Sequence, residues 1–383
     1  MRRQRELLAA PETGGENLII HRTQMTNASV EEISSSLHLE HGERSLLPSF
    51  LVELSSRSMR QVNGRPFNPR EISIFAMAVE DEWADSTSAL MVGDRDDCST
   101  IPLEPSTPSS VAAVDVSSLK VGETETGVLV AIRGAIVWKS DQGYQYVRCG
   151  PLTFHLTHGT DEESPTGLSA LGPSHMFTER AISRLRNVLE RWIQKQICVS
   201  FRDAIVLFDG SLTVGTPDNP TAYLARILDL ARDRGNVVLA FSKSTKLCVF
   251  GRKITSLVSK SAAPCVVDVD RAVAKQFKSS PVRLAGHVYV AKLVEDGFAF
   301  RLDADRQVSH DKRVEAMNRL IASDIVMQGY PETLRLAHIF STFTANDVIG
   351  VQRYLAFAHG LRIAPRFNVR KSLFGPFGTW EAA

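Results

Sequence analysis

Short apolar runs separated by polar turns dominate the stretch from residue 111 to residue 302. Runs of this length that are rich in β-branched and aromatic residues are typical of strands. They predict strands over residues 111–115, 128–132, 135–138, 144–149, 152–156, 204–208, 237–241, 288–293 and 297–302. Because the first five follow one another closely, we expect an antiparallel meander there.

Apolar residues recur at helical spacing between and after these strands. The spacing predicts helices over residues 178–193, 224–235 and 311–323, and another that begins at Pro331. A strand, a helix and a strand follow in order over residues 204–241, which is the pattern of a βαβ unit. We therefore expect an α/β protein with a mixed β-sheet flanked by helices.

The two ends of the chain differ from this central part. Residues 1–93 predict a mostly helical accessory segment, with helix-like stretches at Val30–Leu39 and Arg70–Glu82. Residues 94–110 are rich in Ser, Pro and acidic residues, which favours a linker or long loop. The main domain then spans residues 111–360, and a basic and aromatic tail covers residues 361–383.

Composition narrows the class of protein. A chain of 383 residues with 43% hydrophobic residues and a net charge of +1 is globular, with one large domain or two. Nothing resembles a secretory signal or a membrane span, so we expect a cytoplasmic protein that does not contact a membrane. The five cysteines are scattered and form no CxxC pair, which argues against a disulfide framework or a zinc site. Because the net charge is nearly zero, any contact with nucleic acid must be local.

Two of the apolar runs end in an aspartate, Asp115 and Asp209, and Gly210 follows the second. Two-metal hydrolysis of a phosphodiester needs acids held in this way, because divalent cations about 3.5–4 Å apart take carboxylate oxygens as ligands. The alternative is that each aspartate only caps a turn after its strand. A third acid, Glu190, lies on the flank of the preceding helix, where a solvated side chain is the alternative to a metal ligand.

Taken in order, these pieces resemble the NurA nuclease family. The matching blocks are Val-Ala-Ala-Val-Asp115-Val-Ser-Ser; Glu190, 19 residues ahead of Asp209 in Ile-Val-Leu-Phe-Asp209-Gly-Ser-Leu; Ala240-Phe-Ser242-Lys243-Ser-Thr245; and Gly329-Tyr330-Pro331-Glu-Thr-Leu-Arg-Leu-Ala337-His338. The last block is the most specific, whereas Asp-Gly-Ser by itself is common. The resemblance covers about residues 108–360.

The resemblance implies a ribonuclease H-like fold and a Mn²⁺-dependent DNA nuclease, with Mg²⁺ as the alternative metal. It implies endonuclease and exonuclease action on single strands or DNA ends, 5′–3′ end resection, a homodimer, and partnership with a HerA-type hexameric ATPase, a translocase, in DNA repair or end processing. Carried over to this sequence, it matches Asp115, Glu190 and Asp209 to the metal-binding acids, and Tyr330 and His338 to the Tyr and His of the last motif. His338 is then expected to bind a metal or to protonate the leaving oxygen.

The residues of the later blocks each have a structural alternative. His338 shares a helical face with Leu334, so it could be a histidine partly buried beside the core. Tyr330 could orient a phosphate or the attacking water, or it could pack beside Pro331. Lys243 follows a predicted strand end, where its ammonium group would balance the scissile phosphate unless it is simply solvated.

The tail adds a candidate DNA-binding segment. Arg366, Arg370 and Lys371 alternate there with aromatic residues, a mixture that can contact a phosphate backbone and stack on bases. The alternative is a solvated tail whose aromatic residues pack back on the domain.

One residue departs from the family pattern. Val116 follows Asp115 where the first motif usually has glycine, and valine disfavours a left-handed turn. This departure favours a second interpretation, in which the chain is a catalytically weak NurA-like subunit that serves mainly as a docking partner of the translocase. The acids at three motif positions favour the enzyme.

Overall fold

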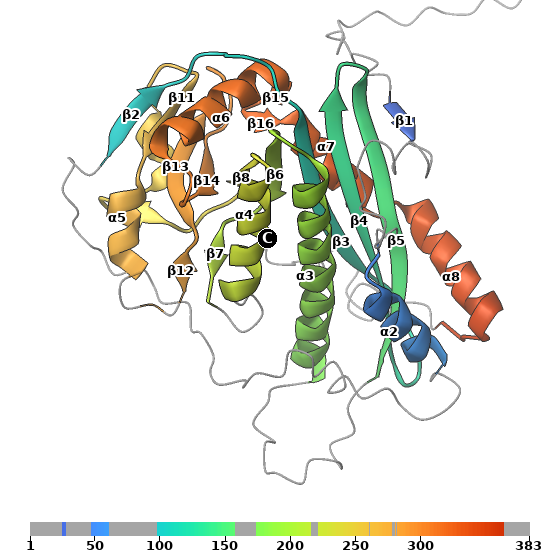
Figure 1. Ribbon diagram of the computed structural model, residues 1–383. Coiled ribbons are helices and arrows are strands. Elements are labelled where there is room, and N and C mark those ends of the chain that lie inside the picture. The colour runs from blue at the N-terminus through green and yellow to red at the C-terminus, as the bar shows by residue number, and fades with distance from the viewer. Residues whose placement is uncertain are drawn as a thin grey trace, which may run out of the picture.

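The computed structural model describes residues 25–27, 47–60, 98–157, 174–215, 221–259, 261–277, 280 and 282–363. Within them, one ten-stranded mixed sheet lies between layers of helices (Figure 1). Its strands, in spatial order, are β1 (Met25–Asn27), β5 (Gly143–Thr157), β4 (Gly127–Ser140), β3 (Val111–Glu123), β6 (Ile205–Asp209), β8 (Val237–Ser242), β14 (Phe300–Asp305), β13 (Gly286–Lys292), β11 (Cys265–Asp268) and β2 (Ser99–Pro102). Three short pairs lie beside it: β7 (Thr213–Val214) with β12 (Arg283–Leu284), β9 (Cys248–Val249) with β10 (Arg252–Lys253), and β15 (Val326–Met327) with β16 (Tyr330–Pro331).

The strand order confirms the expected α/β class. Strands β3, β4 and β5 form the predicted antiparallel meander. Strand β6 lies parallel to β3, and β8 lies parallel to β6 after a helical crossover, which is the predicted βαβ unit. This arrangement of five strands is that of a ribonuclease H-like sheet. Strands β14, β13, β11 and β2 extend it on the other side by antiparallel pairing.

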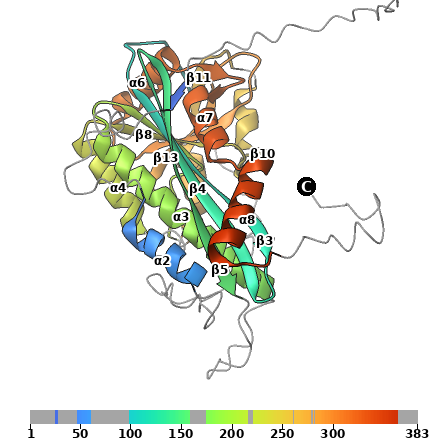
Figure 2. The same cartoon turned by 90° about the vertical axis from the view of Figure 1, so that its right-hand side faces the viewer.

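The helices cover both faces of the sheet, as Figure 2 shows in its edge-on view. Alternate residues of β3 point to opposite faces, as the period of a strand requires. Ala112, Val114 and Val116 pack in one core with the helices α3 and α4, while Val111 and Ala113 pack in another with α6 and α7. The helices are α2 (Ser49–Arg60), α3 (Ser174–Ser200), α4 (Thr221–Asp233), α5 (Asp270–Ala274), α6 (His310–Ser323), α7 (Glu332–Ser341) and α8 (Ala345–His359), with 3-10 turns η6 (Ile254–Val258) and η7 (Lys275–Phe277).

Several strands are longer than the apolar runs that predict them. Strand β3 continues past Asp115 to Glu123, and β4 and β5 each join two runs that the sequence analysis separates. In β4 the polar interruption is Arg133-Gly134, where the register shifts by a bulge. A Cβ on Gly134 would lie 2.2 Å from Ile193 Cδ1, so glycine here allows α3 to approach the strand. Long pairing of β3 and β5 with β4, and of β4 with both of them, therefore continues these strands through residues that locally favour a break.

The segment at residues 94–110 is more than a linker, contrary to the sequence prediction. Its strand β2 forms one edge of the described sheet by antiparallel pairing with β11, and Leu103 is buried. A short strand can be recruited by an open sheet edge whatever its own apolar content, because the edge offers unpaired backbone groups.

The terminal segments are described only in part. In the segment predicted to be mostly helical, α2 is a helix and β1 is a strand that pairs in parallel with β5. Both predicted helical stretches, Val30–Leu39 and Arg70–Glu82, lie outside the described residues. At the other end, Leu361 is buried in a cluster with Leu355 of α8, so the domain continues slightly past residue 360. Among the described residues, none of the helices combines the length and apolar character that a membrane crossing requires.

Candidate active site

The parallel pairing of β3 and β6 brings the two candidate aspartates together. Val114 pairs with Phe208, so Asp115 and Asp209 occupy the next positions on neighbouring strands. Asp209 ends β6 as predicted, and Gly210 follows it with a φ of 98°, a conformation that favours glycine. Asp115 does not end a strand, contrary to the prediction, because β3 continues beside β4 after β6 has stopped. The two carboxylates therefore lie side by side at the point where β6 ends and β3 continues beside β4.

Val116 is compatible with this arrangement. It lies in extended strand opposite Gly134 of β4, and its side chain is buried in the core beneath α3. A β-branched residue suits such a position, and no left-handed turn is required after Asp115. The departure from the family's Asp-Gly-Ser pattern therefore has a structural explanation that leaves the Asp115 carboxylate in place.

Helix α7 supplies two contacts to Asp115. It lies on the face of the sheet toward which Val111, Ala113 and Asp115 point, opposite the face covered by α3. His338 Nδ1 lies 3.0 Å from Asp115 Oδ2, and the buried Ser341 donates its hydroxyl to the same oxygen at 2.6 Å. The His338 side chain is 50% exposed, and its contact with Asp115 goes beyond packing beside the core. Residues 338 and 341 share one side of α7 because they are three apart in a helix.

Asp209 is held by two different side chains. The Tyr330 hydroxyl donates to Asp209 Oδ1 at 3.3 Å, and Lys243 Nζ lies 2.9 Å from Asp209 Oδ2. Tyr330 is buried, with its ring packed edge-on against Phe241 and Phe300. Burial raises the pKa of Tyr330 far above its ordinary value, and the charge of Asp209 adds to this, so the hydroxyl stays protonated and acts as a donor. Lys243 contacts an acid and is therefore not merely solvated.

Glu190 approaches the aspartates from the α3 side of the sheet. Together with Asp115 and Asp209 it lines a cavity of about 540 Å³, and its Oε1 accepts a hydrogen bond from Gln194 at 3.1 Å. Burial raises the pKa of Glu190 to about 7. Arginines on α3 oppose this rise, whereas the charges of Asp115 and Asp209 add to it. Three acids thus face a common space, and their repulsion would be relieved by a cation.

The chemistry of these side chains fits a divalent metal. Ligand atoms of Asp115, Asp209 and His338 all lie within 4.8 Å of one another. The two carboxylates, with Glu190 as a further carboxylate on the cavity, are donors that Mn²⁺ and Mg²⁺ sites use, and the imidazole nitrogen is a donor that favours a transition metal such as Mn²⁺. His338 is not among the residues that line the cavity, but its Nδ1 contacts the Asp115 carboxylate at the edge of that space.

Sequence reasoning missed two residues at this site. Ser341 gives no sequence signal beyond its place three residues after His338. Arg301 lines the cavity and follows an apolar residue in a strand where charged and apolar residues alternate, a pattern that usually marks a solvent-facing strand. The candidate DNA-binding residues Arg366, Arg370 and Lys371 lie outside the described residues.

Comparisons with known proteins identify the family of the chain. A family model described as the NurA domain matches residues 109–340. Among solved structures, the chain is similar to the NurA nuclease from Sulfolobus solfataricus, at 17% identity over 69% of this chain and 88% of that one, with a TM-score of 0.47. It is also similar to endonuclease V from Bacillus subtilis, at 12% identity over 68% of this chain and 89% of that one, with a TM-score of 0.32. A third similarity is to Argonaute from Aquifex aeolicus, at 10% identity over 62% of this chain and 28% of that one, with a TM-score of 0.23.

No curated protein matches the chain. The match to the NurA domain spans well over half of the 383 residues and contains all of the acids described above as well as Tyr330 and His338. The chain therefore belongs to the NurA family.

Proposed function

We propose that this chain is a nuclease that hydrolyses phosphodiester bonds of DNA beside Asp115 and Asp209. The observation that carries the proposal is the convergence of Asp115, Asp209 and His338, from three separate elements, with ligand atoms within 4.8 Å of one another. Glu190 is a third acid on the cavity that Asp115 and Asp209 line, and the mutual repulsion of three acids would be relieved by a bound cation. Membership of the NurA family supports the same reaction.

Asp115, Asp209, Glu190 and His338 would hold one or two divalent cations. A bound divalent cation supplies a Lewis acid that activates water and offsets the negative charge that develops on the phosphate. We propose Mn²⁺ for this site, with Mg²⁺ as the alternative, because an imidazole in a carboxylate-rich set suits Mn²⁺ better than Mg²⁺, which strongly prefers oxygen ligands.

The remaining side chains of the site orient these ligands. Ser341 holds one oxygen of Asp115, and Tyr330 holds one oxygen of Asp209. Lys243 is 41% exposed and paired with Asp209, so its ammonium group can turn toward an incoming phosphate. The half-exposed imidazole of His338 is free to give a proton to the leaving oxygen when it is not a ligand.

The finer parts of the proposal rest on family membership. We propose a homodimer that cleaves single strands or DNA ends by endonuclease and exonuclease action, and that works with a HerA-type hexameric ATPase in DNA repair or 5′–3′ end resection. Light scattering tests the dimer, and a binding assay with a purified HerA-type translocase tests the partnership. The alternative of a weak, mainly docking subunit had Val116 as its support, and the strand position of Val116 removes that support.

The direct experiment incubates labelled single-stranded and double-stranded DNA with the protein and Mn²⁺. Wild type should release product and Asp209→Ala should not, while Asp233→Ala, which removes an exposed acid at the end of α4, should cleave like wild type. Equal product from wild type and Asp209→Ala would refute the assignment of the site. Absence of product from wild type, even with a HerA-type partner, would refute the proposal that the chain is a nuclease. Binding to that partner without cleavage would support the docking alternative.

A further inference from the structure

A buried arginine, Arg301, lines the same cavity as the acids. Arg301 lies on β14 directly opposite Ser242 of β8, and only 6% of its surface is exposed although its side chain borders the cavity. Arginine is rarely buried to this degree without partners, because removing its charge from water is unfavourable. Its surroundings therefore have to explain both its burial and its orientation.

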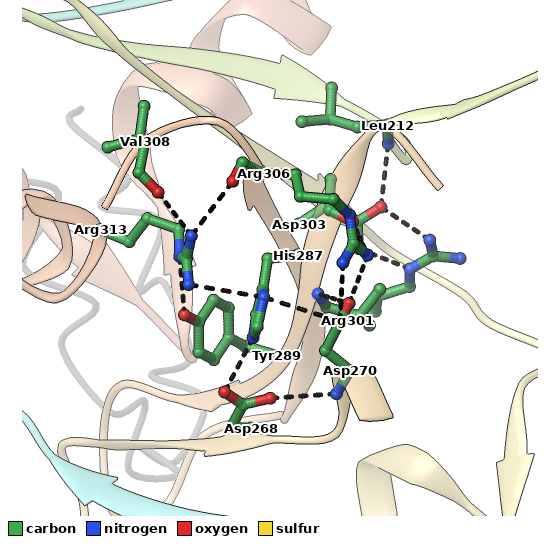
Figure 3. Close-up of polar contacts among 12 residues, drawn as sticks. Leu212, Asp268, Asp270, His287, Tyr289, Arg301, Asp303, Arg306, Val308 and Arg313 are labelled. Carbon is green, nitrogen blue, oxygen red and sulfur yellow. Dashed lines mark hydrogen bonds and ion pairs between the residues drawn. The ribbon is translucent and has the colours of Figure 1, made fainter. Parts of the chain in front are cut away.

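Asp303 holds the guanidinium group of Arg301 in one orientation. Arg301 Nε donates to Asp303 Oδ1 and Nη2 donates to Asp303 Oδ2, both at 2.7 Å (Figure 3). Both side chains come from the same face of β14, because they are two residues apart in a strand. A two-point contact between planar groups fixes the plane of the guanidinium, which a single ion pair would not do.

The same aspartate ties Arg301 to the loop that follows Asp209. Asp303 Oδ2 also accepts from the Leu212 amide at 2.9 Å, and the Leu212 carbonyl accepts from the amides of Ala285 at 2.8 Å and Gly286 at 3.2 Å. A Cβ on Gly286 would lie 2.7 Å from Asp303 Cβ, so glycine allows this close approach. The position of the guanidinium is therefore coupled to the segment that begins at Asp209.

Part of the guanidinium remains available for a ligand. Of its five N–H groups, two bind Asp303, which leaves three. Among the described residues, Arg301 Nη1 has no hydrogen-bond partner. Lys243 is a less suitable phosphate ligand at rest, because its charge is already paired with Asp209 at 2.9 Å. Arg301 is thus an oriented cation with unused donors in a cavity whose acids would otherwise repel an anion.

We propose that Arg301 binds a non-bridging oxygen of a substrate phosphate in this cavity, with Asp303 as the residue that positions it. The inference rests on the proposed function and names a substrate contact within it. A planar guanidinium suits this role because the N–H groups that Asp303 leaves unused, on Nη1 and Nη2, are held in a fixed direction and can donate to a phosphate oxygen. The competing explanation is an ion pair that only stabilises the sheet.

Binding of a fluorescein-labelled single-stranded oligonucleotide, measured by anisotropy in EDTA at several salt concentrations, separates the two explanations. Arg301→Lys and Arg301→Gln should weaken binding by about tenfold or more, as expected for a lost hydrogen bond to a charged group. For Arg301→Gln, the slope of log K against log salt should fall in magnitude by about 0.7, the value for one phosphate contact on a single strand. A merely structural residue would leave that slope unchanged.

Arg313→Lys is the matched control. Arg313 is 7% exposed and belongs to the neighbouring polar network, where it donates to the Tyr289 hydroxyl at 3.0 Å and to backbone carbonyls (Figure 3). It is not among the residues that line the cavity. Its variant should keep the affinity and salt slope of wild type. Thermal unfolding of each variant shows whether the fold is intact. If the Arg301 variants do not fold, a crystal structure of wild type with the oligonucleotide and Ca²⁺ decides, since a phosphate oxygen should lie within hydrogen-bond distance of Arg301 Nη1.

Unchanged affinity and slope in folded Arg301 variants would overturn the inference, as would equal losses in Arg301→Lys and Arg313→Lys, or an oligonucleotide whose phosphates avoid Arg301. These outcomes are separate from failure of the proposed function. Wild type that cleaves DNA without a contribution from Arg301 refutes the inference alone. Wild type that binds DNA through Arg301 but never cleaves it refutes the nuclease alone.

Discussion

Replacing Ser341 with alanine should weaken both the fold and the metal site. A hydroxyl has one proton to donate, and the shortest contact of Ser341 Oγ, at 2.6 Å, is to Asp115 Oδ2. Both residues are buried, so water cannot easily replace the lost donor. A hydrogen bond to a charged group contributes about 1.5–3 kcal/mol, and we expect the free energy of unfolding in EDTA to fall by that amount.

The same change should reduce metal affinity, because Asp115 loses one of the two side chains that hold its Oδ2 oxygen. Loss of a group that orients a ligand typically lowers metal affinity about 10- to 100-fold. Urea unfolding measures the first effect, and calorimetric titration with Mn²⁺ measures the second. Thr342→Ala is the matched control, since Thr342 Oγ1 donates at 2.7 Å to the His338 carbonyl, which Ser341 Oγ also approaches, but Thr342 is exposed and makes no contact with Asp115.

Wild-type stability and Mn²⁺ affinity in Ser341→Ala would refute the reasoning. So would equal losses in Thr342→Ala, because the effect would then come from the end of α7 and not from the Asp115 carboxylate. A loss of stability without a loss of affinity would show that Ser341 supports the fold but does not orient a ligand.

Of three further predictions, two concern other groups of the site and the third concerns an ion pair outside it. Tyr330→Phe should lower kcat for DNA cleavage about tenfold while changing the free energy of unfolding by only about 1 kcal/mol. The stability effect is smaller than for Ser341→Ala because the lost hydrogen bond to Asp209 is longer, at 3.3 Å, and the Asp209 side chain is 24% exposed, so water can replace the donor; an unchanged kcat would contradict this. Burial raises the pKa of Glu190 to about 7, so the folded metal-free protein loses stability as the pH rises from about 4 through 7. In EDTA, Glu190→Gln should therefore be more stable than wild type at about pH 8 and should match wild type near about pH 4. The same variant should lack cleavage activity. Hydrogen bonds from Arg133 hold the pKa of Asp347 well below its usual range, so the pair adds stability that is present above about pH 4 and lost as the pH falls further. Wild type should therefore exceed Asp347→Asn in urea stability at pH 7 by more than it does at pH 2, and a constant difference would argue against the ion pair.

Local sequence was sufficient for much of the fold. The helix α3, the crossover from β6 to β8 and the end of β6 at Asp209 all follow from apolar spacing and from the glycine after the aspartate. These features depend on residues close in the chain, for which the period of the apolar pattern directly predicts a helix or a strand. The blocks around Asp209 and Tyr330 were informative for the same reason, since each places its side chain at the end of a short element.

What the sequence did not determine depends on partners far along the chain. The end of a strand is set by its neighbours, so the continuation of β3 past Asp115 and the role of Val116 became clear only from pairing with β4. The alternation of Arg301 and Asp303 with apolar residues suggests a solvent-facing strand, yet β14 is central and Asp303 is completely buried.

The sequence by itself determined the class of fold and the order of many of its elements, because spacing along one segment records which side chains share a face. The candidate acids came from the resemblance of its motifs to the NurA family. Tertiary structure alone decided that Asp115 meets His338 and Ser341, more than 220 positions away, and that Arg301 joins the cavity. The physical reason is that burial and charge pairing are properties of the packed sheet and its helices, and neither is encoded in the local period of the chain.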